Sequence, residues 1–346
     1  MLCLGKKNFL HRHFALIITF ISTMHTVSNN KPAIPVHAMK GIEYTGIVDA
    51  SELFSTFDLL YLTNNEGLAG MLSTIANQIV PVASDDLNAT KTFKWLFVIH
   101  AIGVWAAQAH NLETVAADEL SPCHFMSIVH YAAQGAKWQG EAPTHGYVWH
   151  LMTAGNWAEW PAAKLWSAVL ELCQCSKSSC YHASGHGLLL SLLRPAFDWD
   201  YSVGYLQPRV GAHVPMPKNL MDKGLHLIAE APGPIQLPAA AGYYDEYFSV
   251  VSQVAFSHPK PDLNAAVAAC SNTSFYVTTC FAYSFTYLAM IHFSNTSSLN
   301  VLYRLCSTIP MRLNREACQG TVTWSINALE NQPTLLSSWG YKMATR

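Results

Sequence analysis

Charged residues are scarce in this sequence. Lys, Arg, Asp and Glu together make up 12% of the 346 residues, and the formal net charge is −2. A typical soluble domain has about 25% charged residues. Proteins that bind nucleic acid carry clustered basic side chains that contact phosphates. The composition therefore excludes a basic nucleic-acid-binding surface, and we expect no nucleic-acid partner.

Common catalytic signatures are also missing. The sequence contains no HExxH zinc-protease motif, no CxxCH haem-attachment motif, no Walker phosphate loop and no GxSxG nucleophile turn. An apolar run of about 20 residues, the length needed to cross a bilayer, is absent as well. The most apolar internal stretch, residues 95–109, is shorter and contains His100. We interpret it as a buried helix, with a second membrane segment as the alternative.

The first 28 residues have the pattern of a secretory signal peptide. Lys6, Lys7 and Arg12 precede an apolar core at residues 14–24, and small residues follow at positions compatible with cleavage. We therefore predict a protein that is secreted or lies in the lumen of the endomembrane system. The alternative is an uncleaved N-terminal segment that anchors the chain to a membrane.

Glycosylation sequons and cysteine number agree with this route. Asn88, Asn272 and Asn295 each begin an Asn-x-Ser/Thr sequon, which predicts glycosylation in a secreted protein. Loss of Cys3 with the signal peptide leaves eight of the nine cysteines. An even number is what a fully oxidised protein needs.

Six of the cysteines repeat one pattern: an apolar run, Cys, a short polar stretch, Cys and another apolar run. Before each first cysteine, the residues one, four and five positions back are apolar, which is one face of a helix. The polar stretches are rich in turn formers. The pattern predicts an all-α fold in which disulfide-stapled helical hairpins form an irregular bundle or a short solenoid.

The repeat also predicts the disulfide pairing. Cys270 is expected to pair with Cys280, and Cys306 with Cys318. Two further bridges then join the four remaining cysteines: Cys123, Cys173, Cys175 and Cys180. If the first hairpin closes on itself through Cys173 and Cys180, Cys123 pairs with Cys175, although Cys173 and Cys175 are close enough to exchange partners.

Proline and glycine divide the mature chain into three parts. An N-terminal helical region at residues 29–194 contains the first cysteine hairpin, and a C-terminal helical hairpin region occupies residues 242–346. Between them, residues 195–241 are rich in Pro and Gly and show little periodicity. We predict that this segment is a long loop or a domain junction.

The first hairpin carries two histidines that the other hairpins lack. His182 and His186 are four residues apart, so they point the same way on a helix and can bind one metal ion. The corresponding positions of the other two hairpins hold Ala, Thr, Gly and Trp. The hairpin therefore does not require histidine there. We predict that this pair helps to bind a transition metal, with zinc or iron favoured by the imidazole ligands.

Two histidines do not complete a metal site, since zinc or iron takes at least three protein ligands. We expect His124 and His130, on the helix that follows Cys123, to be the nearest further candidates. Other options remain open: His145, His150, Asp198 and Asp200. The alternative is that His182 and His186 are buried structural histidines.

The segments around Cys123-His124 and Cys180-Tyr-His182-Ala-Ser-Gly-His186-Gly187 resemble a poorly characterised group of secreted or membrane-associated proteins. Members of that group carry CHxxxH followed by CxHGxGHG-like segments and further paired cysteines. The resemblance covers about residues 120–330. It implies a shape rather than an activity. This chain departs from the pattern at Ile128, in place of the second histidine of CHxxxH, and at Ala183, in place of a glycine.

Two functions follow from these observations. The first is a secreted, glycosylated, disulfide-bonded helical protein that binds a transition metal through a His-x3-His helix. A catalytic version would need an acid or base such as Glu159 or Glu171. The second is a non-enzymatic helical scaffold that binds a protein or lipid partner through an aromatic surface, with structural histidines. The sequence does not decide whether the protein is an enzyme.

Overall fold

The computed structural model is helical throughout the part of the chain that it describes. That part comprises residues 50–75, 89–111, 118–135, 141–193, 220–256, 263–283 and 296–331. No strand occurs within these ranges, which confirms the predicted all-α class. The predicted signal peptide lies outside them.

Some helices are joined by short described turns, and others are separated by segments outside the described residues. In chain order they are α3 (Ala50–Thr63), α5 (Ala89–Asn111), η1 (Asp118–Leu120), α6 (Pro122–Gly135), α7 (Glu141–Ala154), η2 (Trp157–Glu159), α8 (Ala162–Leu172), α9 (Lys177–Leu193), α10 (Leu220–Ala229), α11 (Gly233–Phe256), α12 (Leu263–Ser271), α14 (Thr296–Ser307) and α15 (Arg312–Asn331).

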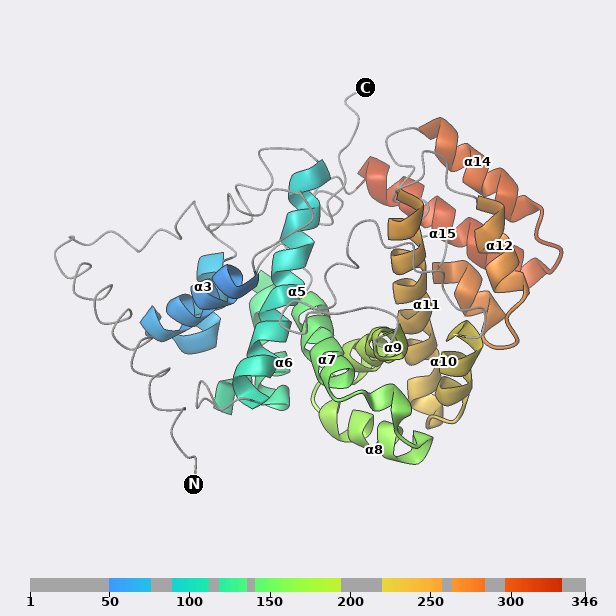
Figure 1. The fold of residues 1–346 in the computed structure, drawn as a ribbon. Coiled ribbons are helices and arrows are strands. Elements are labelled where there is room, and N and C mark those ends of the chain that lie inside the picture. The colour runs from blue at the N-terminus through green and yellow to red at the C-terminus, as the bar shows by residue number, and fades with distance from the viewer. Residues whose placement is uncertain are drawn as a thin grey trace.

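Four of these helices form the centre of the molecule. Helix α5 packs against α7, α7 against α9, and α9 against α11. Figure 1 shows α5 and α11 on either side of α7 and α9, with α14 and α15 beyond α11. The arrangement is an irregular bundle rather than a regular stack of hairpins.

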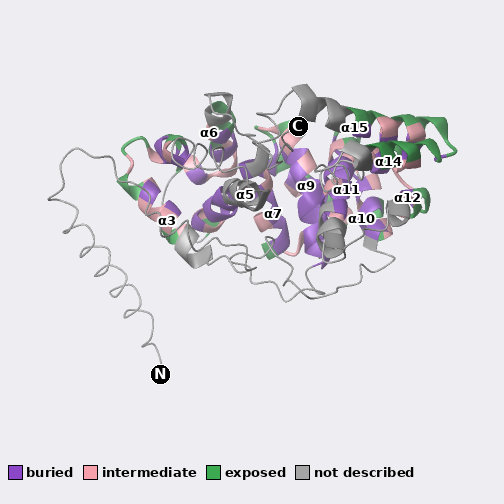
Figure 2. Cartoon of the chain, turned by 90° about the horizontal axis from the view of Figure 1, so that it is seen from above, coloured by how far each residue is buried: buried purple, intermediate pink, exposed green. Residues whose placement is uncertain are grey.

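Helix α9 is the most deeply buried element of this bundle. Every residue from Ala183 to Leu193 is buried, including Ser184, His186 and Ser191. Figure 2 shows that buried residues concentrate in α7, α9 and α11, whereas α14 and α15 expose much of their surface. A helix that is covered all round cannot show a polar face. This burial explains the apolar run Leu188–Leu190 that follows the histidines.

Four disulfides connect the helices as the repeat predicts. Cys173 pairs with Cys180, Cys270 with Cys280, and Cys306 with Cys318. The fourth bridge joins Cys123 on α6 to Cys175, which resolves the open pairing in favour of hairpins that close on themselves.

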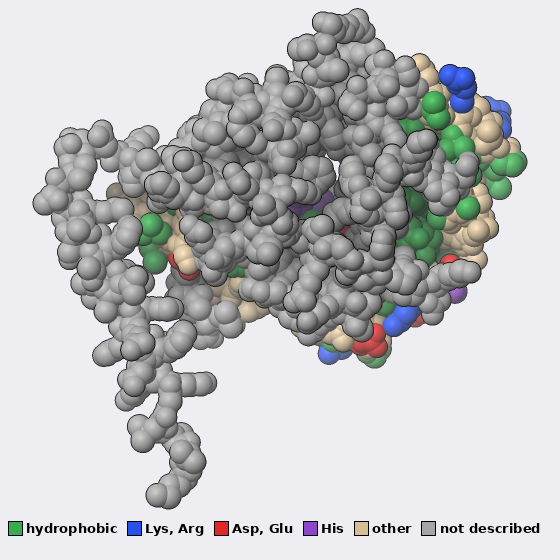
Figure 3. Space-filling view, turned by 45° about the horizontal axis from the view of Figure 1, so that its top comes forward, with side chains coloured by type: hydrophobic (Ala, Val, Ile, Leu, Met, Phe, Trp, Pro, Cys, Tyr) green, Lys and Arg blue, Asp and Glu red, His purple; other side chains and the backbone are tan. Residues whose placement is uncertain are grey.

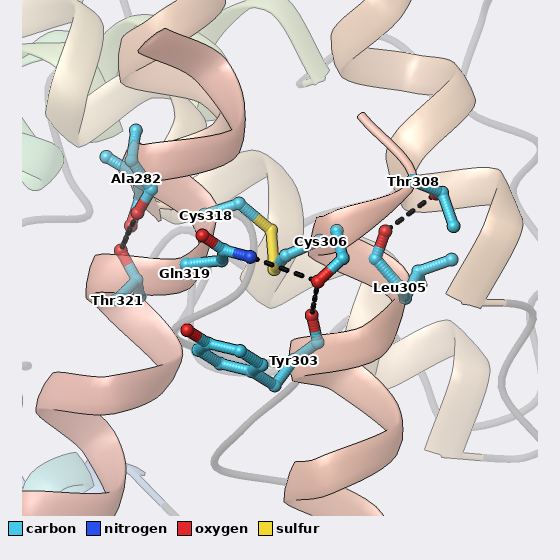
Figure 4. The surroundings of a disulfide bond; sticks show 10 residues. Ala282, Tyr303, Leu305, Cys306, Thr308, Cys318, Gln319 and Thr321 are labelled. Carbon is cyan, nitrogen blue, oxygen red and sulfur yellow. Dashed lines mark hydrogen bonds between the residues drawn. A yellow bond between two sulfur atoms is a disulfide. The ribbon is translucent and has the colours of Figure 1, made fainter. Parts of the chain in front are cut away.

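Figure 4 shows the third hairpin in detail. Near the Cys306–Cys318 bridge, the Gln319 amide donates a hydrogen bond of 3.0 Å to Ser307 Oγ. On the next turn, the Thr321 hydroxyl donates to the carbonyl of Ala282 at 2.7 Å. These bonds tie α15 both to α14 and to the helical turn after Cys280.

The apolar stretch at residues 95–109 forms part of α5. Ala101 to Ala107 are buried in the bundle, as expected for a core helix. Among the described helices, none is both long and apolar enough to cross a membrane.

The predicted loop or junction at residues 195–241 contains helical structure. Residues 220–241, nearly half of the segment, include α10 and the beginning of α11, which contains Pro238. Pro238 lies inside α11, as its sixth residue, where proline lacks the N–H that would donate to the carbonyl four residues earlier. Residues 195–219 lie outside the described residues.

Candidate metal centre

Helix α9 places His182 and His186 on the same face. They are one turn apart, and their Nε2 atoms lie 3.0 Å from each other. Their rings meet edge to face, with centroids 4.8 Å apart. The prediction that the two side chains share one space is confirmed. Because α9 is surrounded by other helices, that space lies inside the bundle.

Helix α11 brings two carboxylates to the same place. Asp245 Oδ2 lies 3.4 Å from His182 Nε2 and 3.5 Å from His186 Nε2. The neighbouring Glu246 accepts a hydrogen bond of 2.9 Å from Nδ1 of His186. With its proton on Nδ1, the uncharged His186 ring has its lone pair on Nε2. That atom points toward His182 and Asp245.

A close approach of two glycines allows this geometry. A Cβ atom added to Gly185 on α9 would lie 2.6 Å from the backbone nitrogen of Tyr243, and one added to Gly242 on α11 would lie 2.8 Å from the carbonyl carbon of His182. Both values are too short for a real side chain, so only glycine permits this helix separation. The same Cβ on Gly242 would lie 3.1 Å from the His186 ring.

A third imidazole comes from α7. His145, His182 and His186 each offer a ligand atom, and these atoms lie within 4.8 Å of one another. The ring centroid of His145 is 5.2 Å from that of His182 and 5.0 Å from that of His186. Its Nε2 is buried and has no hydrogen-bond partner. A buried polar atom without a partner is costly, and a metal ion would satisfy it.

The charges of these groups depend on one another. Burial lowers the pKa of His186, but hydrogen bonds to Asp245 and Glu246 and their negative charges outweigh it and raise the pKa to about 9. For Asp245, burial raises the pKa, whereas hydrogen bonds and charges from His182 and His186 bring it down to about 2. Burial, with the charges of neighbouring histidines, lowers the pKa of His145 well below its usual value. Without a metal ion, the cluster therefore holds an anionic Asp245 beside a His186 that favours its protonated form and a His145 that favours its neutral form.

Solvent reaches one side of the cluster. The side chains of His182 and Asp245 are 18% and 20% exposed, whereas that of His186 is 4% exposed. A metal ion could enter from this side, and a water molecule or a small ligand could reach it there.

The donor distances match those of a metal centre. Metal–nitrogen bonds of about 2.0–2.1 Å put two ligand atoms of a tetrahedron about 3.3 Å apart. The three separations among His182 Nε2, His186 Nε2 and Asp245 Oδ2 are 3.0, 3.4 and 3.5 Å. Glu246 completes the arrangement as the carboxylate that orients a ligand histidine, a common feature of zinc sites.

The other predicted ligands lie elsewhere or outside the described residues. His124 and His130 are exposed on α6, and Nδ1 of His124 lies 3.0 Å from the backbone carbonyl of Asp118. His150 is half-buried on α7, and burial lowers its pKa to about 4. Asp198 and Asp200 lie outside the described part of the chain. The group of three that the described residues form therefore contains His145 and not His124 or His130.

The candidate acids or bases, Glu159 and Glu171, lie away from the histidine group. Glu159 forms an exposed ion pair of 3.2 Å with Lys223, and Glu171 is exposed. Neither residue belongs to the histidine group. Asn272 is exposed between Cys270 and Cys280, while Asn88 and Asn295 lie outside the described residues.

Sequence reasoning missed Asp245 and Glu246. The available signal was an acidic pair in the otherwise apolar and aromatic start of α11, in a chain with few charges. Such a pair on a buried helix needs partners. The histidines of α9 are those partners.

Comparisons with family models, with curated proteins and with solved structures found no match to this chain.

Proposed function

We propose that this protein is secreted, glycosylated and disulfide-bonded, and that it binds one transition-metal ion, zinc or iron, through His182, His186 and His145, with Asp245 as a further ligand. The convergence of His182, His186 and Asp245, with Glu246 on the far nitrogen of His186, carries the proposal. The chemistry of the donors supports zinc or iron rather than calcium, which prefers oxygen ligands.

Whether His145 is a ligand distinguishes a zinc site from an iron site. Two histidines and one carboxylate are the ligand set of non-haem iron centres, in which other coordination positions stay open. Three histidines are the ligand set of several zinc sites in which water takes the fourth position. The partial exposure of His182 and Asp245 is compatible with either. Metal analysis of His145→Ala separates them, since a zinc site of this kind loses a ligand and a two-histidine iron site keeps its full set.

The experiment that tests the proposal is elemental analysis of protein purified from a secreting host without an affinity tag. We expect about one equivalent of zinc or iron per chain, and loss of most of it in His182→Ala and His186→Ala. His124→Ala and His130→Ala are matched controls, because these histidines are exposed and lie on another helix. A parent protein without metal, or equal metal in all four variants, would show that the α9 histidines are structural.

Exposed apolar side chains favour a second candidate function, a scaffold that binds a protein or lipid partner. Val301 and Tyr303 on α14 are 50% and 41% exposed, and Met311 just before α15 and Leu313 in its first turn are 62% and 64% exposed. Figure 3 shows hydrophobic side chains at the surface on the side of the C-terminal helices. The test compares binding to phospholipid vesicles and cross-linking to secreted proteins between the parent and a Met311→Asp, Leu313→Asp variant. Equal binding would exclude this surface.

A further inference from the structure

The four central helices contain one sequence pattern twice. His100-Ala101-Ile102-Gly103 on α5 matches His182-Ala183-Ser184-Gly185 on α9 in three of four residues. Two helices further along the chain, Gly146-Tyr147 on α7 matches Gly242-Tyr243 on α11. Among the described elements, one α-helix lies between α5 and α7, namely α6, and one lies between α9 and α11, namely α10.

The two helix crossings are also alike in space. A Cβ added to Gly103 would lie 2.5 Å from the nitrogen of Tyr147, and one added to Gly185 would lie 2.6 Å from the nitrogen of Tyr243. A Cβ on Gly146 would lie 2.8 Å from the carbonyl carbon of His100, and one on Gly242 would lie 2.8 Å from that of His182. Matching residues therefore make matching close contacts.

We call α5 with α7 the first helix pair and α9 with α11 the second. Each residue that α9 and α11 place at the candidate metal centre then has a counterpart in the first pair. Counting from the matched glycines, His100 corresponds to His182, Val104 to His186, Trp149 to Asp245 and His150 to Glu246. The first helix pair has thus kept one potential ligand, and it has an apolar or aromatic side chain at two of the other positions.

Two of the counterparts, His100 and Trp149, lie against the centre itself. The Trp149 and His100 rings stack with centroids 4.7 Å apart and an interplanar angle of 6°. The Trp149 ring is also 5.3 Å from the His186 ring and 6.0 Å from the His145 ring. Trp149 is only 6% exposed. The stack therefore covers the side of the histidine group that faces α5 and α7.

We infer that α5–α7 and α9–α11 are two copies of one structural unit, of which only the second keeps a metal-binding set. The first copy contributes His145 and has been converted into an aromatic wall, the Trp149–His100 stack, that closes one side of the same centre. This inference rests on the proposed function. Trp149 is a positioning residue: it orients the ligand histidines and excludes water from that side. A hydrophobic shell of this kind controls solvent access to a metal.

The first test measures how fast a chelator removes Co²⁺ from the loaded protein. Trp149→Ala should lose the ion about ten-fold faster than the parent, because outer-shell changes lower metal affinity by about 10- to 100-fold and we assign this loss to the dissociation rate. Trp149→Phe should restore slow loss, because an aromatic ring suffices for the wall. Trp157→Ala is the matched control, since Trp157 in η2 stacks on Trp160 directly after η2, with ring centroids 4.9 Å apart. Equal rates for Trp149→Ala and the parent would overturn the aromatic wall.

The second test restores the missing ligands of the first copy. Val104→His combined with Trp149→Asp recreates the pattern of α9 and α11 around His100, and this variant should bind two equivalents of Co²⁺ instead of one. Val104→Ala with Trp149→Asn is the control, and it should bind one. A helical variant that still binds one equivalent would refute the correspondence of the two copies. If the variant does not fold, the Trp149→Ala and Trp149→Phe rates still decide the role of the wall. A parent that binds no Co²⁺ would instead refute the proposed function.

Discussion

Substitution of Glu246 by glutamine tests the electrostatics of the proposed centre most directly. In the absence of an ion, the carboxylates of Asp245 and Glu246 raise the pKa of His186 to about 9, despite its burial. At pH 7.5, a group with this pKa is about 97% protonated. A metal ion requires the lone pair on Nε2. Binding should therefore release about one proton from His186, and affinity should rise about ten-fold per pH unit until pH 9 is passed.

Glu246→Gln has two opposed effects on metal affinity. Loss of the carboxylate that orients His186 should weaken binding about 10- to 100-fold. Loss of its negative charge should also lower the pKa of His186, so that fewer protons compete with the metal; at pH 7.5 the competition in the parent amounts to about 30-fold. The two effects roughly cancel near pH 7, and only the first remains above pH 9. The ratio of parent affinity to variant affinity should therefore increase with pH.

Competition with a chromophoric chelator measures this ratio at pH 6.5, 7.5 and 9.5. Titration calorimetry in two buffers of different ionisation enthalpy counts the protons released at pH 7.5. We expect about one proton for the parent and clearly fewer for Glu246→Gln. A pH-independent affinity ratio, together with equal proton release, would refute the assignment of Glu246 as the partner of His186.

The same structure makes further predictions. Because the pKa of His186 is higher in the folded state than in the unfolded chain, its protonation stabilises the metal-free fold by about 3 kcal/mol below pH 6.5. This stabilisation should disappear as pH rises through 9. Urea denaturation at pH 6 and at pH 9.5 measures the difference. Gly185→Ala should destabilise the protein, since the added methyl group meets the backbone of α11. Gly320→Ala, with nothing within 4 Å of the new atom, should stabilise it by up to about 1 kcal/mol, and thermal melting compares the two. On the chain-entropy model, removal of the Cys123–Cys175 bridge, which spans 52 residues, should destabilise the protein by about 4 kcal/mol. Removal of the Cys306–Cys318 bridge, which spans 12 residues, should destabilise it by about 3 kcal/mol. Urea denaturation of the two double alanine variants measures both values, and the reverse order would contradict the prediction. Asn272→Gln should abolish one glycan in the secreted protein, and a mass unchanged apart from the substitution would show that this exposed sequon is not used.

The local part of the fold could be predicted from the sequence. The apolar spacing before Cys173, Cys270 and Cys306 identifies helices, and the short polar stretches after them place two cysteines within bridging distance. These relations involve residues at most 12 positions apart. The fourth bridge, which joins residues 52 positions apart, followed only because two cysteines were left over.

The histidine pair could also be predicted, because four-residue spacing on a helix fixes which way both side chains point. The rest of the site depends on contacts between helices. His145 was one of four further options behind His124 and His130, because nothing in the sequence near His182 indicates that α7 rather than α6 lies beside α9. The Cys123–Cys175 bridge holds α6 to the start of the hairpin, but His124 and His130 remain at the surface.

Pairing of α9 with α11 had a sequence signal that periodicity does not detect. The glycines at positions 185 and 242 permit a helix separation that any side chain would prevent, and the same pair of patterns occurs at positions 103 and 146. Recognition of the repeated His-Ala-x-Gly and Gly-Tyr segments would have predicted two like crossings. The second crossing would then have placed Asp245, one turn after Gly242, near the histidine one turn before Gly185.

The two carboxylates of α11 also provide partners for the histidines that are buried in this bundle. A buried imidazole needs partners for both nitrogens, and His186 finds Glu246 on one side and His182 with Asp245 on the other. Asp245 and Glu246 together carry two negative charges that one imidazolium does not balance. A divalent cation held by Asp245 and the neutral histidines would balance both charges, and it would also give the buried Nε2 of His145 a partner. The surplus of negative charge within a helical core of otherwise low charge is therefore the strongest physical reason to expect a metal ion there.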